Sequence, residues 1–309
     1  MSVRMVRATH SVGLIGLGAA SHVLAGLLPF MVARAIGRLG LVPATTWMYG
    51  IGAVALLVAL LVGRWRRTFV DESTAVWQSP HRWHLVLGLA GFLVAGVAYY
   101  FGLSRSPRVA EYVFLTRLDW LLQAAVAILI LREPWTSQGL IGGVIALTGG
   151  LLLTWTSALG TSGLVAALVY IVASLAGYGG FKPITTWRGR AGAATLMVWR
   201  HWINTLGFAA LLAMQPTVAT PDGVGLLLCA VGAVAIITLF LLRFTALTAL
   251  PLWVLSVQAP VQATVAIVMT FVTGGSLPAV TYLAIALVVV GEGFVAVGEA
   301  RRASVAVRG

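Results

Sequence analysis

Residues 98–154 read AYYFGLSRSPRVAEYVFLTRLDWLLQAAVAILILREPWTSQGLIGGVIALTGGLLLT, and the fold depends on this stretch. Two long apolar runs are joined here by a short polar connection, and each run is long enough to cross a bilayer. An ionised side chain in hydrocarbon is costly, so strongly polar residues inside such a run indicate a functional or paired site. The first run, Val109–Leu131, carries Glu111, Arg117, Asp119 and Gln123.

The composition is that of a membrane protein. Of the 309 residues, 60% are hydrophobic and 9% are charged, whereas a soluble domain carries about 25% charged residues. The net charge of +12 comes from basic residues scattered through short connections. That distribution fits loops beside anionic lipid and not the continuous basic face of a nucleic-acid-binding protein. We therefore expect the lipid bilayer as a partner and no nucleic acid, and the single cysteine, Cys229, excludes a disulfide within the chain.

The expected fold is all-α, with ten transmembrane helices. No stretch has the length or polarity of a separate soluble domain, and the longest polar connection, Arg64–Arg82, is interpreted as a surface loop. The ten segments with the apolar length of a spanning helix are residues 12–33, 43–62, 84–103, 109–131, 138–156, 163–182, 194–214, 223–244, 250–272 and 279–298.

Lysine and arginine outside these segments predict the orientation, because cytoplasmic loops are enriched in both. With the N-terminus inside, thirteen lysines and arginines lie on the cytoplasmic side, counting Lys182 at the inner end of segment 163–182, and only Arg34, Arg38, Arg105 and Arg108 lie outside. The sequence therefore predicts a multi-pass protein of the cytoplasmic membrane with both termini in the cytoplasm.

A weak internal repeat relates the two halves of the chain. FLTRLDWLLQAAVAIL (residues 114–129) aligns with VLSVQAPVQATVAIVM (residues 254–269), which places Thr116 over Ser256 and Trp120 over Pro260. Because each half would hold an odd number of helices, the halves must be inverted relative to each other. Secondary transporters with inverted repeats bind their substrate near the midplane, between the halves.

The order of these features resembles the EamA-type transporters of the drug/metabolite transporter superfamily. The first half ends in LILREPWTSQGLIGGVIALTGGLLL (residues 129–153), and the second half has Pro260 in its fourth helix and Gly291 late in its last. The chain departs from the family pattern at Trp120, where a proline is usual, and at Thr273, where a glutamate is usual. The resemblance implies two five-helix repeats, residues 1–157 and 158–309, and an exporter of amino acids or other small metabolites.

Helical phase groups the polar residues of Val109–Leu131. At 100° per residue, Thr116, Asp119 and Gln123 share one face, which we expect to line a cavity; the alternative is a polar network that fixes helix packing. Arg117 lies nearly opposite Asp119, and is either a substrate anchor or part of a structural ion pair. Glu111, near the outer end, could carry a proton or pair with a neighbouring arginine.

Other helices add further candidates. Arg200 is expected to reach the membrane surface by snorkelling, and Asn204 on the same face to reach the cavity. Gln258 and Gln262 share a face beside the carbonyl that Pro260 frees, which indicates either a hydrogen-bonding wall or a packing kink. The aromatic residues that could line a cavity, with packing as the alternative, are Trp47, Tyr99, Tyr100 and Tyr178.

These assignments give two sets of candidate residues and no catalytic or metal-ligating set. The candidates for proton coupling are Asp119, Glu111 and Glu292, of which Glu292 could instead reach the interface. The candidates for substrate binding are Thr116, Arg117, Asp119, Trp120, Gln123, Asn204, Ser256, Gln258, Gln262 and Tyr99.

The leading hypothesis is a secondary transporter that works by alternating access on a small-molecule substrate and uses no cofactor. No nucleotide-binding loop is present, so a proton or substrate gradient would drive it. An intramembrane enzyme is disfavoured, because the chain has neither HExxH nor GxSxG; a non-transporting receptor or assembly subunit is the third class.

Small residues four apart, Gly142, Ala146 and Gly150, predict close packing against the last helix. A monomer suffices, and a homodimer through this face is not required.

Overall fold

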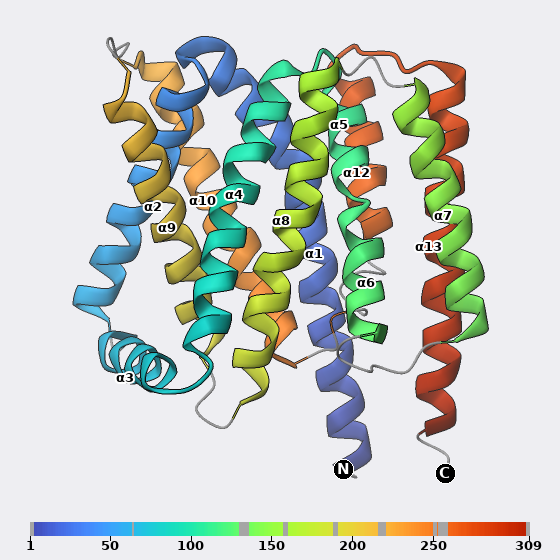
Figure 1. Ribbon diagram of the computed structural model, residues 1–309, viewed down its shortest axis with the longest axis horizontal. Coiled ribbons are helices and arrows are strands. Elements are labelled where there is room, and N and C mark those ends of the chain that lie inside the picture. The colour runs from blue at the N-terminus through green and yellow to red at the C-terminus, as the bar shows by residue number, and fades with distance from the viewer. Residues whose placement is uncertain are drawn as a thin grey trace.

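The structure of the chain, a computed structural model, describes residues 3–63, 65–129, 136–156, 160–187, 191–215, 221–249, 252 and 259–306. Within these residues all regular secondary structure is helical, as predicted (Figure 1). Five described stretches are long and apolar enough to cross a membrane: Gly16–Leu39, Leu41–Val62, Arg82–Arg105, Thr161–Thr186 and Gly223–Ala249.

Every predicted membrane segment overlaps a helix. The helices are α1 (Val3–Leu39), α2 (Leu41–Val62), α3 (Trp65–Gln78), α4 (Arg82–Arg105), α5 (Val109–Thr116), α6 (Asp119–Leu129), α7 (Ser137–Thr156), α8 (Thr161–Thr186), α9 (Ala193–Ala213), α10 (Gly223–Ala249), α12 (Ala259–Val272) and α13 (Ala279–Ala306).

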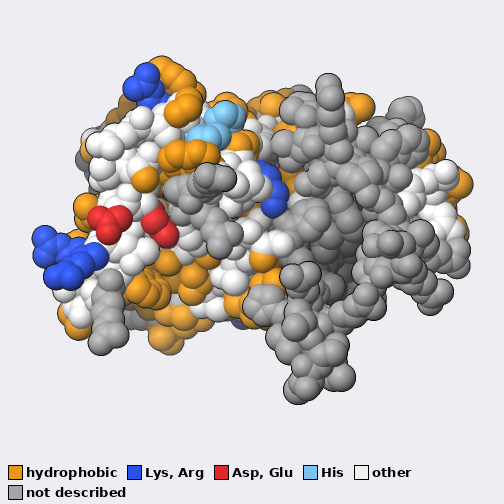
Figure 2. Space-filling model, turned by 90° about the horizontal axis from the view of Figure 1, so that it is seen from below, with side chains coloured by type: hydrophobic (Ala, Val, Ile, Leu, Met, Phe, Trp, Pro, Cys, Tyr) orange, Lys and Arg blue, Asp and Glu red, His pale blue; other side chains and the backbone are white. Residues whose placement is uncertain are grey.

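Helix α3 corrects one prediction, because Arg64–Arg82 was expected to be a surface loop. Phe69, Glu72 and Val76 are spaced three and four residues apart, so they share one face of a helix. Val76 is fully buried and Phe69 packs against the adjoining core, while Trp65 and Trp77 are about half exposed. Seen from below, acidic and basic side chains gather on the side of the molecule where α3 lies (Figure 2). The sequence did not predict this helix, because an apolar face of only a few residues produces little helical periodicity in a segment that is otherwise polar.

The buried face of α3 also supports the start of α9. Glu72 Oε2 accepts hydrogen bonds from the backbone N–H of Gly192 at 2.8 Å and from the hydroxyl of Thr195 at 2.5 Å. The first N–H groups of a helix have no partner within the helix, and a carboxylate there also meets the positive end of the helix dipole. Glu72 therefore fixes α3 to the beginning of α9.

Close backbone contacts hold two helix pairs together. α4 packs along α8, and α7 packs along α13. A Cβ atom at Gly180 of α8 would lie 2.5 Å from the backbone nitrogen of Gly88 in α4. A Cβ atom at Gly291 of α13 would overlap the backbone of Gly142 and Ala146 in α7, so the predicted packing against the last helix is confirmed for these two residues, while Gly150 lies outside the described side chains.

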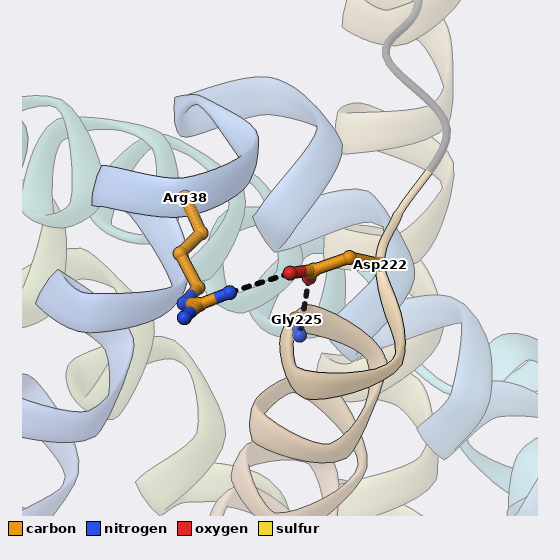
Figure 3. A network of polar contacts seen from close by, with 3 residues as sticks. All are labelled: Arg38, Asp222 and Gly225. Atoms are coloured by element: carbon orange, nitrogen blue, oxygen red, sulfur yellow. Dashed lines mark hydrogen bonds and ion pairs between the residues drawn. The ribbon is translucent and has the colours of Figure 1, made fainter.

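A surface ion pair joins the end of α1 to the start of α10 (Figure 3). Arg38 Nη1 lies 2.5 Å from Asp222 Oδ2, and Asp222 Oδ1 accepts a hydrogen bond of 2.7 Å from the backbone N–H of Gly225. Asp222 thus caps α10 while it pairs with Arg38. Both side chains are about half exposed, so the pair contributes little to stability.

Two neighbouring glycines provide a test of the α4–α8 contact. Gly180→Val should lower the free energy of unfolding by about 1–3 kcal/mol or more, because the new side chain meets the backbone of α4. Gly179→Val is the control, since a Cβ atom there meets nothing within 4 Å. Thermal unfolding of both purified variants measures the difference, and equal melting temperatures would contradict the packing described.

The cap on α9 provides a second test. Glu72→Ala should cost about 1 kcal/mol of stability, the usual loss when a helix cap is removed. Asp71→Ala removes the adjacent, exposed carboxylate and should leave the melting temperature unchanged. Equal effects of the two substitutions would show that Glu72 acts through the net charge of α3 and not through the cap.

Candidate functional site

A polar cavity lies among α1, α4, α8, α9, α10 and α12, at the break between α5 and α6. Its volume is about 60 Å³, which holds only a few water molecules. We call it the central cavity; its lining is Ala25, Leu28, Phe92, Ala95, Gly96, Tyr99, Tyr100, Arg117, Tyr170, Ser174, Tyr178, Arg200, Leu239, Phe240, Arg243 and Gln262.

The helix predicted over 109–131 is broken at Arg117 and Leu118. The backbone N–H of Arg117 donates to Phe114 O at 3.0 Å and that of Leu118 to Leu115 O at 3.2 Å. These bonds reach back three residues, as in a tight final turn, and α6 then starts anew at Asp119. The prediction of one continuous helix is therefore wrong, and the end of α5 and the start of α6 meet beside the cavity.

The break brings Arg117 and Asp119 to the same neighbouring helix. Arg117 Nη2 donates to the hydroxyl of Tyr170 at 2.6 Å, and Asp119 Oδ2 accepts from the hydroxyl of Ser174 at 2.8 Å. Tyr170 and Ser174 lie one turn apart on α8. The predicted opposite placement of Arg117 and Asp119 is wrong, because the turn between α5 and α6 changes the helical phase on which it rested.

The polar group around Asp119 is smaller than predicted. Gln123 Nε2 donates to Asp119 Oδ2 at 3.3 Å, so these two share a face of α6 as expected. Thr116 is fully buried, but its hydroxyl donates to Val113 O within its own helix. Asp119 and Gln123 thus stand directly behind the cavity wall, where Ser174 connects them to the lining.

Arg200 is buried in the bundle, so the prediction that it snorkels to the membrane surface is wrong. Its side chain is 7% exposed and lines the cavity. The guanidinium carbon lies 3.2 Å from the ring centre of Phe240 and 5.6 Å from that of Phe92, and Nη2 is 3.4 Å from the hydroxyl of Tyr49. Aromatic faces attract a guanidinium, and they hold this one inside the protein.

Asn204 lies one turn further along α9. It is fully buried, and its Nδ2 donates to Arg200 O at 2.9 Å. Its Oδ1 faces Gly96, where a Cβ atom would overlap it. Asn204 therefore packs behind the cavity wall that Gly96 forms and is not itself part of the lining.

Arg243 of α10 is a lining residue that the sequence reasoning missed. It is 7% exposed, and its Nη1 donates to the hydroxyl of Tyr178 at 3.0 Å. The sequence does mark Arg243, because this arginine interrupts an apolar run as Arg117 does. It was passed over because the predicted helix, residues 223–244, ended one residue later, which placed Arg243 at the membrane surface. Tyr170, Ser174 and Phe240 were also missed, and no charge or spacing in the sequence distinguishes them.

The remaining candidates divide into three groups. Tyr99, Tyr100, Tyr178 and Gln262 line the cavity, and Gln262 Nε2 donates to Ala25 O at 3.1 Å. Glu111 is fully buried, forms an ion pair of 2.9 Å with Arg108 and does not line the cavity. The ion pair is the alternative that the sequence left open beside proton coupling. Trp47 is 39% exposed. The predictions outside the described residues or side chains are those for Trp120, Ser256, Gln258, the kink below Pro260, and Glu292.

Comparison with known proteins finds matches for the first half of the chain and for one shorter stretch. Residues 13–155 match the EamA-like transporter family, which confirms the resemblance found in the sequence. A stretch of 78 residues is 36% identical to the "Probable 4-amino-4-deoxy-L-arabinose-phosphoundecaprenol flippase subunit ArnF" of Klebsiella pneumoniae. This match covers 25% of the chain and 61% of that protein, so it spans less than two thirds of the relative.

A solved structure shares the fold over nearly the whole chain. This crystal structure superposes with a TM-score of 0.69 over 93% of this chain and 98% of its own. The sequence identity is 17%, so the similarity concerns the fold alone.

Proposed function

We propose that this chain, whose residues 13–155 belong to the EamA-like transporter family, is a secondary transporter that exports small metabolites such as amino acids by alternating access. The proposal rests above all on the central cavity at the α5–α6 break. Broken membrane helices whose ends meet at a buried polar cavity are a common form of transporter binding site. Charged side chains at this depth are expensive to bury and usually functional.

The order of helix packing supports the proposed inverted repeats, residues 1–157 and 158–309. The first helix of each half packs on the third membrane helix of the other, since α1 contacts α10 and α8 contacts α4. The second helices pack on each other as α2 and α9, and the last as α7 and α13. Exchange of the halves leaves this pattern unchanged, as a pseudo-twofold axis requires.

The apolar helices and the family match identify an integral membrane protein. α1 begins and α13 ends at the same end of the bundle, where α3 also lies (Figure 1). We assign this end to the cytoplasm, because α3 and the start of α4 carry basic residues there, Arg66, Arg67 and Arg82.

The size of the cavity supports alternating access over a fixed open pore. Ligand sites for small organic molecules occupy about 300–1,000 Å³, several times the volume of about 60 Å³ found here. A metabolite therefore fits only after helices of the two halves separate. The conformation described is the closed one of the two-state cycle that we propose.

A second candidate follows from the ArnF match. Its name describes a flippase subunit, which favours the alternative that this chain works as part of a membrane assembly. In that case the purified chain alone would show no flux, and a second protein would remain bound to it through purification.

Flux into proteoliposomes tests the primary proposal. Reconstituted protein should exchange radiolabelled amino acids or another metabolite pool across the membrane. Asp119→Asn should slow this exchange at least roughly tenfold. The substitution removes the charge from the buried hydrogen bonds that Asp119 accepts from Ser174 and Gln123, and a hydrogen bond to a charged group is worth about 1.5–3 kcal/mol. Asp71→Asn, on the surface of α3, is the control and should transport at the unsubstituted rate. Unchanged flux in Asp119→Asn would refute the assignment of the cavity.

A further inference from the structure

We propose that the central cavity binds a dianionic group through Arg117, Arg200 and Arg243. The transported metabolite would then be a small organic anion that carries a phosphate monoester or two carboxylates. This inference rests on the proposed transport function and names its substrate class.

The balance of charge at the cavity carries the proposal. The three arginines are 6–7% exposed, and arginine stays protonated in proteins. Among the described residues, Asp119 is the one carboxylate that contacts the lining, through Ser174, since Glu111 pairs with Arg108. Three positive charges and one negative leave a net charge of +2, which a bound dianion would neutralise. A buried charge without such compensation is strongly destabilising.

Buried hydrogen-bond donors point the same way. Nε of Arg117, Nε and Nη1 of Arg200 and Nη2 of Arg243 are buried without an acceptor among the described residues. The hydroxyls of Tyr170 and Tyr178 accept from Arg117 and Arg243, so each keeps its own proton to donate. The polar side chains of the lining thus offer mainly donors, and phosphate and carboxylate oxygens, which accept without donating, would complement them.

The three arginines come from both halves of the chain. Arg117 lies at the α5–α6 break, whereas Arg200 and Arg243 lie on α9 and α10. Phe240 and Phe92 contact the guanidinium of Arg200, and aromatic rings do not accept all of its N–H groups, since Nε and Nη1 have no acceptor among the described residues. An anion held by all three would connect the halves across the cavity, so its arrival and release would be linked to their relative movement.

Ligand-induced stabilisation of the purified full-length protein tests this inference. Inorganic phosphate and malonate, titrated at constant ionic strength, should raise the melting temperature saturably, whereas chloride and choline should not. Arg117→Gln, Arg200→Gln and Arg243→Gln should each weaken phosphate binding at least roughly tenfold, because each removes charge-assisted hydrogen bonds. Arg38→Gln is the matched control, an arginine of the exposed pair with Asp222, and should bind as the unsubstituted protein does.

A fourth variant separates binding from folding. Asp119→Asn raises the net charge of the cavity to +3 and should tighten phosphate binding, a direction that misfolding cannot produce. The proposal would be overturned by weaker or unchanged binding in Asp119→Asn, by cavity-arginine variants that bind phosphate as well as Arg38→Gln does, or by no stabilisation with either dianion.

Two further measurements, lipid competition and flux, identify the source of the dianion and distinguish a failure of this inference from a failure of the transport proposal. In nanodiscs, phosphate binding that is weakened by phosphatidic acid but not by phosphatidylcholine indicates that the site takes a lipid headgroup. Phosphate binding that phosphatidic acid leaves unchanged indicates a soluble anion. Both results support a dianion site. Flux of a neutral or cationic metabolite without dianion binding would overturn this inference and leave transport intact. Dianion binding without any flux would support the site and contradict transport.

Discussion

A guanidinium group at membrane depth must find partners inside the protein, and the centre of this bundle is built to supply them. Arg117, Arg200 and Arg243 each lie against an aromatic ring and within hydrogen-bond reach of a tyrosine hydroxyl. Those tyrosines and phenylalanines come from α2, α8 and α10, so the arginines draw both halves of the chain around one cavity. Each guanidinium keeps at least one buried N–H group without an acceptor among the described residues, and the proposed anion would accept hydrogen bonds from these groups.

The break between α5 and α6 is the second requirement. A continuous helix would direct Arg117 and Asp119 to opposite sides, and only one of them could reach α8. The tight turn at Arg117 ends α5 and restarts the chain at Asp119, so that both side chains meet α8 one turn apart. It also places the positive end of the α6 dipole near the cavity, which adds to the attraction for an anion.

Hydropathy predicted the membrane helices, because a helix in lipid needs a long apolar run. The spacing of small residues predicted the α7–α13 contact, because closely packed helices need small side chains where they meet. Three features escaped prediction for physical reasons. The face of α3 is decided by Phe69, Glu72 and Val76, which contact distant helices. The direction of Arg200 depends on Phe240, remote in sequence. The break at Arg117 has no proline or glycine to mark it, so no local signal separates it from a regular turn.

In the proposed cycle the central cavity opens to each side of the membrane in turn, and cysteine labelling measures this directly. Cys229 is the only native cysteine, so a Cys229→Ala background allows Ser174→Cys, a lining position that is 2% exposed, to be probed alone. In vesicles of known orientation, a membrane-impermeant maleimide should label this site from either side, and bound phosphate should slow the labelling. Labelling from one side only, or from neither, would contradict alternating access through this cavity.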